Sequence, residues 1–278
     1  MISVVIPAHN EEAVIGRCLR ALLTGADPDE LEIVVACNGC TDATADIARS
    51  FGPPVRVVET PVASKIAALN LGDAAATGFP RFFVDADVEF DGAGLRAVAE
   101  VLREGRLLAA APGLRIDTSG ASWLVRAYYR VLERLPSVSD DLVGRGVYAL
   151  SAEGRARFGE FPDVIADDHF VRRSFAPSER GVVAGVASTV RVPVTLRGLL
   201  QRKVRVFAGN AEIAEHGSAH REGLSGLLAV LRADPTRMPD VAVYVAVNAV
   251  AKGLAWRARR RGSPLSWGRD DSRQPSLR

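Results

Sequence analysis

The stretch "RFFVDADVEF", residues 81–90, places two carboxylates, Asp85 and Asp87, directly behind a short apolar run. The run "FFV" is aromatic and β-branched, which predicts a buried strand over residues 81–84. Charged groups at the end of a buried strand must be paired, solvated or bound to a metal ion. The two aspartates are therefore the first candidates for a functional site.

The chain before this strand alternates apolar runs with alanine-rich, amphipathic segments. Such alternation is typical of βαβ units, so we predict an α/β fold with a mostly parallel central sheet flanked by helices. The predicted strands cover residues 3–6, 32–36, 55–59 and 81–84, and the predicted helices cover residues 11–23, 42–50, 65–77 and 93–103.

The second half of the chain is less regular. Residues 112–136 predict a strand and an amphipathic helix, a further strand and a basic helix flank Pro193, and residues 239–262 predict a helix that is apolar on most of its surface. We expect a domain over residues 1–215, with a nucleotide-binding half (1–90) and an acceptor half (91–215). A helical C-terminal extension with a polar tail would occupy residues 216–278.

Composition indicates a globular protein without bulk attraction to nucleic acid. The 278 residues are 48% hydrophobic, and 35 basic against 33 acidic residues give a net charge of +2. A local basic cluster, "WRARRRG", lies at residues 256–262. The sequence shows no signal pattern and no uninterrupted apolar segment of roughly 18 residues, so we expect a cytoplasmic location.

The three cysteines are too few for a disulfide scaffold and fit a reducing compartment. Cys37 and Cys40 form a C-x-x-C motif between a predicted strand and a helix, which leaves a thioredoxin-type redox function as an alternative. A zinc site would need further ligands at suitable spacing, and no histidine lies near these two cysteines in the sequence.

Polar segments follow all four predicted strands. They are "PAHNEE" (7–12), "CNGCTDAT" (37–44), "TPVASK" (60–65) and "DAD" (85–87). Each could be a turn or a helix cap alone, with Asn10 capping one helix and Thr41 or Asp42 the next. Ligands of open parallel sheets bind beyond the carboxyl ends of the strands, so four such segments together indicate a binding site.

Lys65 and the first acidic pair suggest anionic and cationic ligands. Lys65 begins a predicted helix, where the dipole disfavours a cation, so a phosphate partner explains it better than solvation alone. In an extended strand, Asp85 and Asp87 would point to one face, about 7 Å apart. A divalent ion, Mg²⁺ or Mn²⁺, held there would neutralise a leaving diphosphate.

A second acidic pair, Asp167 and Asp168, follows another apolar stretch. A general base needs an accessible carboxylate, and a neighbouring carboxylate raises its pKa. Arg172 and Arg173 could hold these carboxylates in place. The alternative is a helix cap, which an aspartate at this position also satisfies.

Taken in order, these segments resemble the inverting, GT-A-fold glycosyltransferases of family 2. "VVIPAHNEEAVIGRCLRALL" is similar to the family's "IPAYNEE" opening, "CNGCTDATADIA" to its "DNGSTDGT" turn, and "SKIAALNLGDAAATG" to its "GKxxALNxG" element. "FVDADVEF" resembles the metal-binding D-x-D motif, "ADDHFVRR" the E-D base motif, and "VRVFAGN" the R-W-x-x-G element of processive relatives. The resemblance covers roughly the first 210 residues.

The resemblance implies a metal-dependent transfer of a sugar, with inversion, from a nucleotide-diphosphate-sugar donor to an acceptor hydroxyl. It favours a UDP-sugar donor and a small-molecule or lipid-linked acceptor, with Mg²⁺ or Mn²⁺ as cofactor. Asp168 would be the catalytic base. The donor nucleotide would be bound by Pro7, Ala8, His9, Glu11, Asn38, Lys65, Asp85, Ala86 and Asp87, and the metal by Asp87 and Asp85. The acceptor or diphosphate would be bound by Arg145, Gly146, Asp167 and Arg205.

The acceptor end of the site would come from the segment around Trp123, Tyr128 and Tyr148. Aromatic rings there could stack on sugars, although residues at helical spacing such as Trp123 and Tyr128 are more often core. Three positions depart from the family pattern. Cys37 stands where an acidic residue is usual, Asp167 where glutamate is usual, and Val206 where tryptophan is usual, which argues against processive synthesis.

Two other functions remain open from the sequence. A haloacid-dehalogenase-like, Mg²⁺-dependent phosphatase also uses D-x-D-x-V with a lysine, here Lys203, and an acidic pair, but it carries the D-x-D on its first strand. A non-catalytic membrane-surface protein on a degenerate GT-A fold would use the apolar C-terminal helix and the basic cluster. That helix could instead pack on the domain or on a second copy in a homodimer.

Overall fold

The computed structural model describes residues 1–135, 142–163, 167–214 and 224–260. The chain forms two compact units. The sheet unit comprises Met1–Arg115 and Asp141–Val190, and the helical unit comprises Ile116–Asp140 and Arg191–Arg278. The domain boundaries expected at residues 90 and 215 stay predictions.

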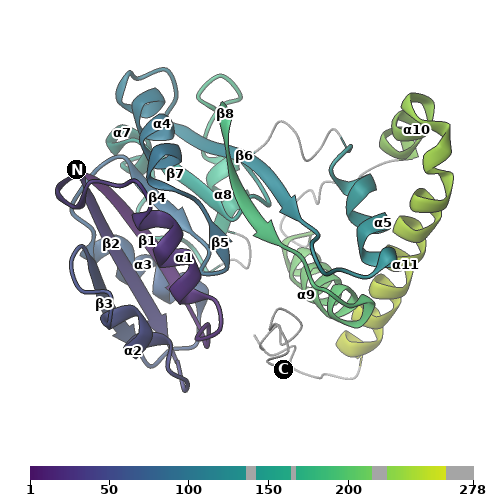
Figure 1. Cartoon of the computed structure of the whole chain (residues 1–278), viewed down its shortest axis with the longest axis horizontal. Coiled ribbons are helices and arrows are strands. Elements are labelled where there is room, and N and C mark those ends of the chain that lie inside the picture. The colour runs from purple at the N-terminus through teal and green to yellow at the C-terminus, as the bar shows by residue number, and fades with distance from the viewer. Residues whose placement is uncertain (136–141, 164–166, 215–223, 261–278) are drawn as a thin grey trace. The chain divides into compact units, whose positions relative to one another are not determined.

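The sheet has eight strands in the order β3-β2-β1-β4-β7-β6-β8-β5 (Figure 1). The strands are β1 (Ile2–Ala8), β2 (Leu31–Asn38), β3 (Val55–Thr60), β4 (Arg81–Val84), β5 (Val88–Glu89), β6 (Ala109–Asp117), β7 (Val147–Leu150) and β8 (Arg180–Arg191). Strands β3, β2, β1 and β4 pair in parallel, whereas β7 pairs antiparallel with β4 and β6, and β5 with β8. The predicted α/β sheet is confirmed, and its parallel half contains the four strands predicted from the N-terminal sequence.

The parallel strands are buried on both faces because successive side chains enter two different cores. Val4 and Ile6 of β1 belong to one core, and Val5 between them belongs to the other. Strand β4 divides in the same way, because Phe82 and Val84 belong to the first core and Phe83 belongs to the second. This period of two explains the continuous apolar runs, since a central parallel strand has no solvent face.

Helices cover each core of the sheet unit. They are α1 (Ile15–Leu23), α2 (Thr44–Arg49), α3 (Lys65–Ala75), α4 (Gly92–Arg103), α7 (Ala152–Arg155) and α8 (Asp167–Arg173), with a 3₁₀ turn, η1 (Pro28–Glu30). Helices α1, α2 and α4 contribute to the first core and α3 and α8 to the second. In α1, residues Ile15, Cys18, Leu19 and Leu22 repeat at helical spacing and are all buried.

Two predicted helix starts were wrong. Helix α1 begins at Ile15, four residues after the predicted start, and Val14 at its N-cap makes no side-chain capping bond. Helix α2 begins at Thr44, and its N-cap is Ala43 rather than Thr41 or Asp42. The polar side chains of these segments instead bond to one another across the two loops.

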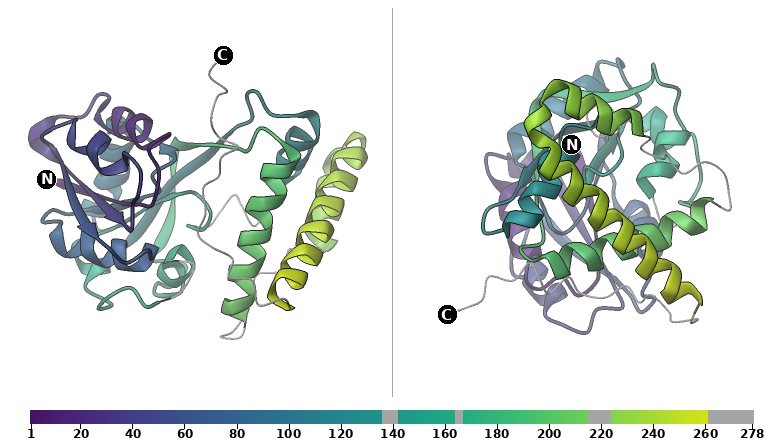
Figure 2. Two further views of the ribbon diagram at one scale, coloured as in Figure 1. Left: turned by 90° about the horizontal axis from the view of Figure 1, so that it is seen from below. Right: turned by 90° about the vertical axis from the view of Figure 1, so that its right-hand side faces the viewer.

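The helical unit contains α5 (Trp123–Leu132), α9 (Leu196–Ala214), α10 (Leu224–Ala233), the 3₁₀ turn η2 (Pro235–Arg237) and α11 (Met238–Arg260). Helices α9 and α11 run side by side in Figures 1 and 2, and α11 also packs on α5. Tyr128 of α5 stacks on Tyr244 of α11 with ring centroids 4.8 Å apart. Among the described helices, none combines the length and hydropathy that crossing a bilayer requires.

Candidate functional site

The carboxyl ends of the parallel strands gather most of the predicted site residues. Because β1 pairs in parallel with β2 and β4, and β2 with β3, the segments that follow them lie at one edge of the sheet. Pro7 and Ala8 are the last residues of β1 and are buried, and His9 and Glu11 follow in the loop.

The loops after β1 and β2 are joined by hydrogen bonds. The imidazole Nδ1 of His9 lies 2.5 Å from the carbonyl oxygen of Asn38, so Nδ1 is the protonated nitrogen. The side-chain oxygen of Asn10 accepts the backbone N–H of Thr41 at 2.8 Å. The backbone N–H of Glu11 donates to the hydroxyl of Thr44 at 2.7 Å. These bonds fix the two loops relative to each other.

Asn10 holds this junction in a backbone conformation that few residues adopt. Its φ is 55°, and it is the only non-glycine residue with positive φ among those that the structure describes. Asparagine tolerates this region better than most residues, and such strain persists where the surrounding structure requires it. The predicted role of Asn10 as a helix cap was wrong, because its side chain bonds to the neighbouring loop.

Asn38 ends β2 with a buried side chain that lacks hydrogen bonds. The residue is 1% exposed, and neither its amide nitrogen nor its side-chain oxygen has a hydrogen-bond partner in the described structure. An unpaired buried amide is costly, and buried polar groups in native proteins nearly always have a partner. A water molecule or a ligand would satisfy it.

The acidic segment is a turn and not an extended strand. Strand β4 ends at Val84, and the N–H of Val88 donates to the carbonyl oxygen of Asp85 at 3.1 Å. The prediction of an extended strand through Asp85 and Asp87 was therefore wrong, because residues 85–88 form a turn. Asp85, Ala86 and Asp87 occupy this turn; Ala86 is buried, and both aspartates are partly exposed.

Gly146 packs directly against this turn. Its carbonyl oxygen accepts the N–H of Asp85 at 2.8 Å. Its φ is 65°, and a Cβ at this position would lie 2.5 Å from Cγ2 of Val88 and 3.4 Å from Oδ2 of Asp85. Only glycine satisfies both the conformation and the space, so Gly146 fixes the position of the acidic turn.

Lys65 joins the two acidic segments. Its ammonium lies 2.9 Å from Oδ1 of Asp85 and 2.8 Å from Oδ1 of Asp167. Burial alone would lower the pKa of Lys65, but the carboxylates of Asp167 and Asp85 outweigh it and leave the pKa raised. The anionic partners of this helix-start lysine are thus carboxylates of the chain, where the sequence had suggested a phosphate.

Asp167 is fixed on both oxygens. Lys65 pairs with Oδ1, and the hydroxyl of Tyr148 donates to Oδ2 at 2.9 Å. Tyr148 is buried, and its ring stacks on Phe83 with centroids 5.0 Å apart. Burial, with the neighbouring charge of Asp167, raises the pKa of Tyr148 well above its usual value, so it stays a donor. Tyr148, expected to stack on a sugar, is instead placed to orient Asp167.

Asp168 lies beside this pair in the first turn of α8. Its Oδ2 accepts the N–H of Gly144 at 2.8 Å, and its Oδ1 accepts the N–H of His169 at 2.8 Å. Burial, and next the charge of Asp167, raises the pKa of Asp168. A raised pKa makes a carboxylate a stronger base, which is the direction that general-base catalysis needs.

A further contact near α8 was not anticipated from the sequence. The side-chain amide of Asn70 accepts the backbone N–H of Phe161 at 2.8 Å and donates to its carbonyl oxygen at 3.1 Å. This pairing ties α3 to the segment ahead of α8. Asn70 belongs to the same helix as Lys65, so α3 contacts both Phe161 and Asp167. Its presence in "ALN" was the only sequence signal.

The residues present fit a hard divalent cation that also takes oxygens from its substrate. Asp85 and Asp87 supply carboxylates, and Mg²⁺ commonly uses one or two carboxylates with phosphate oxygens. Within the described residues, no group of three or more His, Cys, Asp or Glu side chains gathers to hold a metal by itself. A metal bound here would therefore need further ligands from a substrate or from water.

The site contacts described above do not involve Arg145, Trp123 or Tyr128. Arg145 is buried, and its guanidinium donates to the carbonyl oxygen of Pro112 at 3.2 Å. Arg205 lies in α9 of the helical unit, and its side chain is outside the described part. In that unit Trp123 is exposed, whereas Tyr128 is core.

The cysteine motif does not have the environment of a redox nucleophile. Burial, and next the Cys40 thiol, raises the pKa of Cys37 to about 12. The Cys40 thiol donates to the carbonyl oxygen of Ala8 at 3.3 Å. Since thiol exchange needs a thiolate near neutral pH, these contacts favour a structural role in the loop.

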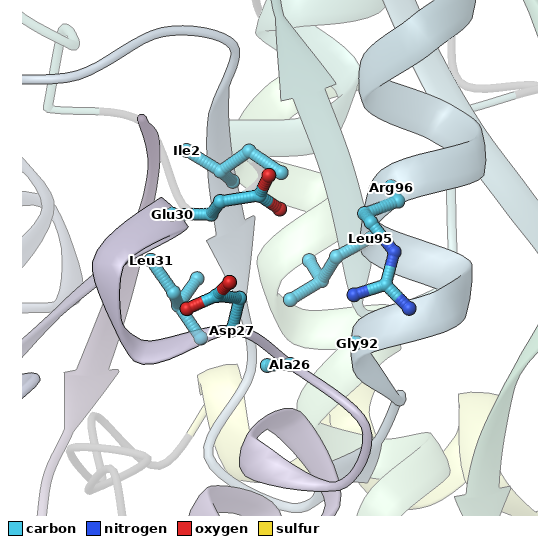
Figure 3. Close-up of a pocket in the computed structure, with 8 residues that line it drawn as sticks. All are labelled: Ile2, Ala26, Asp27, Glu30, Leu31, Gly92, Leu95 and Arg96. Carbon is cyan, nitrogen blue, oxygen red and sulfur yellow. The ribbon is translucent and has the colours of Figure 1, made fainter.

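A small pocket lies at the opposite edge of the sheet (Figure 3). It is formed at the amino ends of β1 and β2, and Ile2, Leu31 and Leu95 line its apolar part. Asp27, Glu30 and Arg96 also line it (Figure 3). It contains none of the predicted site residues.

Solved glycosyltransferase structures share this fold. The mannosyltransferase PcManGT from Pyrobaculum calidifontis, solved with GDP-Man and Mn²⁺, matches with a TM-score of 0.56 and 21% identity, over 95% of this chain and 81% of that chain. S. aureus TarS 1-349 in complex with UDP matches with a TM-score of 0.54 and 14% identity, over 98% of this chain and 94% of that one. At these identities the likeness establishes the GT-A fold alone.

Curated relatives match over short segments. The probable glycosyltransferase YdaM of Bacillus subtilis (strain 168) is 36% identical over 94 residues, which is 31% of this chain and 22% of the relative. Glycosyltransferase AglE of Haloferax volcanii is 33% identical over 91 residues, 31% of this chain and 30% of the relative. The matched segments thus span less than a third of either relative.

The family assignment rests on a longer match. Residues 3–174 match the sequence model described as "Glycosyl transferase family 2", which is more than half of the chain. The match includes the loops after β1 and β2, Lys65, the acidic turn and both aspartates of α8. It also removes the phosphatase alternative, since the D-x-D follows the fourth strand and not the first. This chain belongs to glycosyl transferase family 2.

Proposed function

We propose that this chain transfers a sugar from a nucleotide-diphosphate-sugar donor to an acceptor hydroxyl, with inversion and with the help of Mg²⁺ or Mn²⁺. The observation that carries the proposal is the position of Lys65, which contacts Asp85 on the proposed donor side and Asp167 beside the proposed base. One lysine thus brings the two acidic motifs to one place in the sheet unit.

The donor would bind across the loops after β1 and β2. Pro7, Ala8, His9 and Glu11 would line the nucleotide, and the unpaired amide of Asn38 would find its hydrogen-bond partners there or in a bound water. Cys37 is buried where the family usually has an acidic residue, so the nucleobase of the donor would be recognised without that carboxylate. A UDP-sugar is the favoured donor, and a GDP-sugar is the first alternative because PcManGT was solved with GDP-Man.

Asp87 and Asp85 would hold the divalent cation. When bound, such a cation supplies positive charge to a departing diphosphate. Asp85 already shares Lys65 with Asp167, so the lysine can balance the charge of both carboxylates when the metal is absent. Gly146 would keep the turn in place for this purpose.

Asp168 would remove the proton from the acceptor hydroxyl. A base opposite the leaving group gives a single displacement, which inverts the anomeric centre. The raised pKa of Asp168 supports this role, and Tyr148 and Lys65 would keep Asp167 oriented beside it. Arg145, Asp167 and Arg205 remain proposed contacts of the acceptor or the diphosphate, and the acceptor would be a small molecule or a lipid-linked one.

The first test is a thermal-shift panel of UDP- and GDP-sugars with and without Mn²⁺ or Mg²⁺. A ligand that binds only the native state raises its melting temperature, so we expect stabilisation by one nucleotide family that increases with metal. Asp87→Asn should lose the metal-dependent part of the shift and keep the melting temperature of the free protein. No stabilisation by any nucleotide would overturn the proposal.

A second test establishes the chemistry. With a donor identified, release of the nucleoside diphosphate should depend on Asp168, and the anomeric configuration of the product, measured by NMR, should be opposite to that of the donor. Retention of configuration would contradict a single displacement. Donor binding without turnover in every acceptor screen would favour a non-catalytic binding protein.

A further inference from the structure

Helix α11 of the helical unit is apolar on its exposed side as well as on its packed side. Its packed side contributes Val241, Tyr244, Val247, Ala251 and Ala255 to the unit's interior. Its exposed positions from 238 to 250 are Met238, Pro239, Ala242, Val245, Ala246, Ala249 and Val250, and none is charged. A surface helix normally places polar residues on this side, so the exposed face needs an explanation.

The exposed side carries bulky side chains, of which Met238, Val245 and Trp256 recur at helical spacing. Met238 is 64% exposed, Val245 48%, Val250 50% and Trp256 55%. They extend along most of the 23 residues of α11. The charged residue of the first turn, Asp240, does not interrupt this face, because it is buried and pairs with Arg130 at 2.6 Å. A continuous apolar face of this length marks an interaction surface.

Positive charge begins where the apolar face ends. Lys252 and Arg257 are exposed, with the Lys252 ammonium 5.3 Å from the ring centroid of Phe207 on α9, and Arg257 follows Trp256 directly. The sequence continues with arginines at positions 259, 260 and 261. Tryptophan beside basic residues, at the end of an apolar helix face, is the arrangement found where a helix meets the boundary between lipid headgroups and acyl chains.

The charges favour a membrane over a second copy of the chain. From residue 238 to residue 260 the sequence contains one acidic residue, Asp240, and Arg130 and Arg237 already contact it. A second α11 therefore offers no carboxylate to meet Lys252 and Arg257. An anionic membrane surface carries many negatively charged headgroups in one plane, and the apolar face of the helix would lie just beneath them.

We infer that α11 docks the protein on an anionic membrane surface, lying in the plane of the headgroups with Val245 and Val250 toward the acyl chains. Lys252 and Arg257 would contact lipid phosphates, and Trp256 would lie at the boundary. This inference does not depend on sugar transfer, because its evidence comes from the helical unit alone.

The test is flotation of the purified full chain with lipid vesicles. We expect the protein to float with vesicles of phosphatidylcholine containing about one third phosphatidylglycerol, and much less with phosphatidylcholine alone. Lys252→Gln with Arg257→Gln should weaken binding to the anionic vesicles roughly 30-fold, since each basic residue near such a surface contributes about 1 kcal/mol. Raised salt should have the same effect on the wild type.

A second variant tests the apolar face. Val245→Glu with Val250→Glu should reduce vesicle binding by more than about tenfold while leaving the melting temperature near that of the wild type, because both side chains are exposed. The matched control is Ala93→Glu with Ala152→Glu, which adds two carboxylates at exposed helix starts in the sheet unit and should float like the wild type. Trp256→Ala supplies a milder change if the double glutamate variant does not fold.

Three outcomes would overturn the inference. The first is a wild type that stays unbound to anionic vesicles, and the second is a control that loses binding as fully as the α11 variant. The third is a dimer in light scattering that Val245→Glu with Val250→Glu converts to a monomer, with no vesicle binding by either protein. That result would assign the face to a second copy. Donor-induced thermal shifts are measured on the same samples, so failure here is separable from failure of the proposed transferase activity.

Discussion

Lys65 and Asp167 form an ion pair, with the ammonium nitrogen 2.8 Å from Oδ1, that connects the start of α3 to the start of α8. The same ammonium contacts Asp85 at 2.9 Å. Two acidic motifs that are far apart in the sequence therefore depend on one cation. The two carboxylates would repel each other without it. Lys65 therefore stabilises the folded site itself, in addition to any contact that it makes with a donor.

Replacement of Lys65 by methionine should destabilise the protein and damage the site together. It leaves the buried Asp167 carboxylate without its cation, and breaking a buried pair costs about 3–5 kcal/mol. Because the Asp85 side chain is 42% exposed, we expect the lower end of that range. Denaturant unfolding measures the effect, with Arg103→Met as a control for loss of an exposed cation. An unchanged midpoint would show that the ion pairs are not formed in solution.

Replacement of Asp168 by asparagine should lower transfer by about 10²- to 10⁴-fold, the usual contribution of a general base. The change should also alter the pH dependence of stability. The pKa of Asp168 is raised in the native state, so between the ordinary aspartate pKa, about 3.9, and the raised one the native state holds more protons than the unfolded state. Stability therefore falls as the pH rises through this window.

The asparagine variant lacks that titration. Its melting temperature, measured from acid to neutral pH, should improve relative to the wild type as the pH rises through the same window. Asparagine can keep only some of the hydrogen bonds that Asp168 accepts from Gly144 and His169, so the variant also differs from the wild type by an amount that does not depend on pH. The decisive quantity is therefore how the difference in melting temperature between the two proteins changes with pH. A difference that does not change with pH would contradict the raised pKa.

The order of the elements in the parallel half could be predicted because its cause is local. Apolar runs such as "FFV" are long enough for a strand and too short for a helix, and β4 matches its predicted bounds over Arg81–Val84. Strand and helix alternation then dictates a parallel sheet and its ligand edge. The helix starts after β1 and β2 could not be predicted, since Asn10 bonds to the facing loop, and Asp42 divides its carboxylate between the facing loop and Thr44 of its own helix.

The contacts within the site were less predictable than its members. The sequence indicated Lys65, Asp85 and Asp167, but their shared ion pairs connect residues from three separate elements. The role of Tyr148 was missed for the same reason, because β7 pairs antiparallel with β4 and brings Tyr148 opposite Phe83. No local pattern in the sequence specifies that register.

Asn38→Leu should affect nucleotide binding and protein stability differently. The Asn38 amide is buried without a hydrogen-bond partner, so replacing it by an apolar side chain of similar size should leave the free energy of unfolding unchanged or raise it by about 1 kcal/mol. Donor affinity should fall if the amide serves the nucleotide. Thermal unfolding and nucleotide titration by calorimetry measure both. A clear loss of stability would mean that a bound water already satisfies the amide.

Asn10→Gly and Asn10→Ala should differ in a way that identifies what Asn10 contributes. Both lose the hydrogen bond to the N–H of Thr41, but only glycine adopts φ near 55° without strain. We expect alanine to cost about 1 kcal/mol more than glycine in free energy of unfolding. Equal losses would place the whole effect in the hydrogen bond.

Gly146→Ala should disturb the acidic turn more than Gly144→Ala, although both glycines have positive φ. At Gly144 an added Cβ meets nothing within 4 Å, so its cost is the backbone strain of about 1–2 kcal/mol. At Gly146 the Cβ would lie 2.5 Å from Val88, which adds about 1–3 kcal/mol of overpacking and displaces the turn that holds Asp85 and Asp87. Gly146→Ala should therefore lower both the melting temperature of the free protein and the metal-dependent shift that the donor causes. Gly144→Ala should lower only the melting temperature of the free protein. If the two variants lose donor stabilisation equally, the position of the acidic turn does not control metal binding.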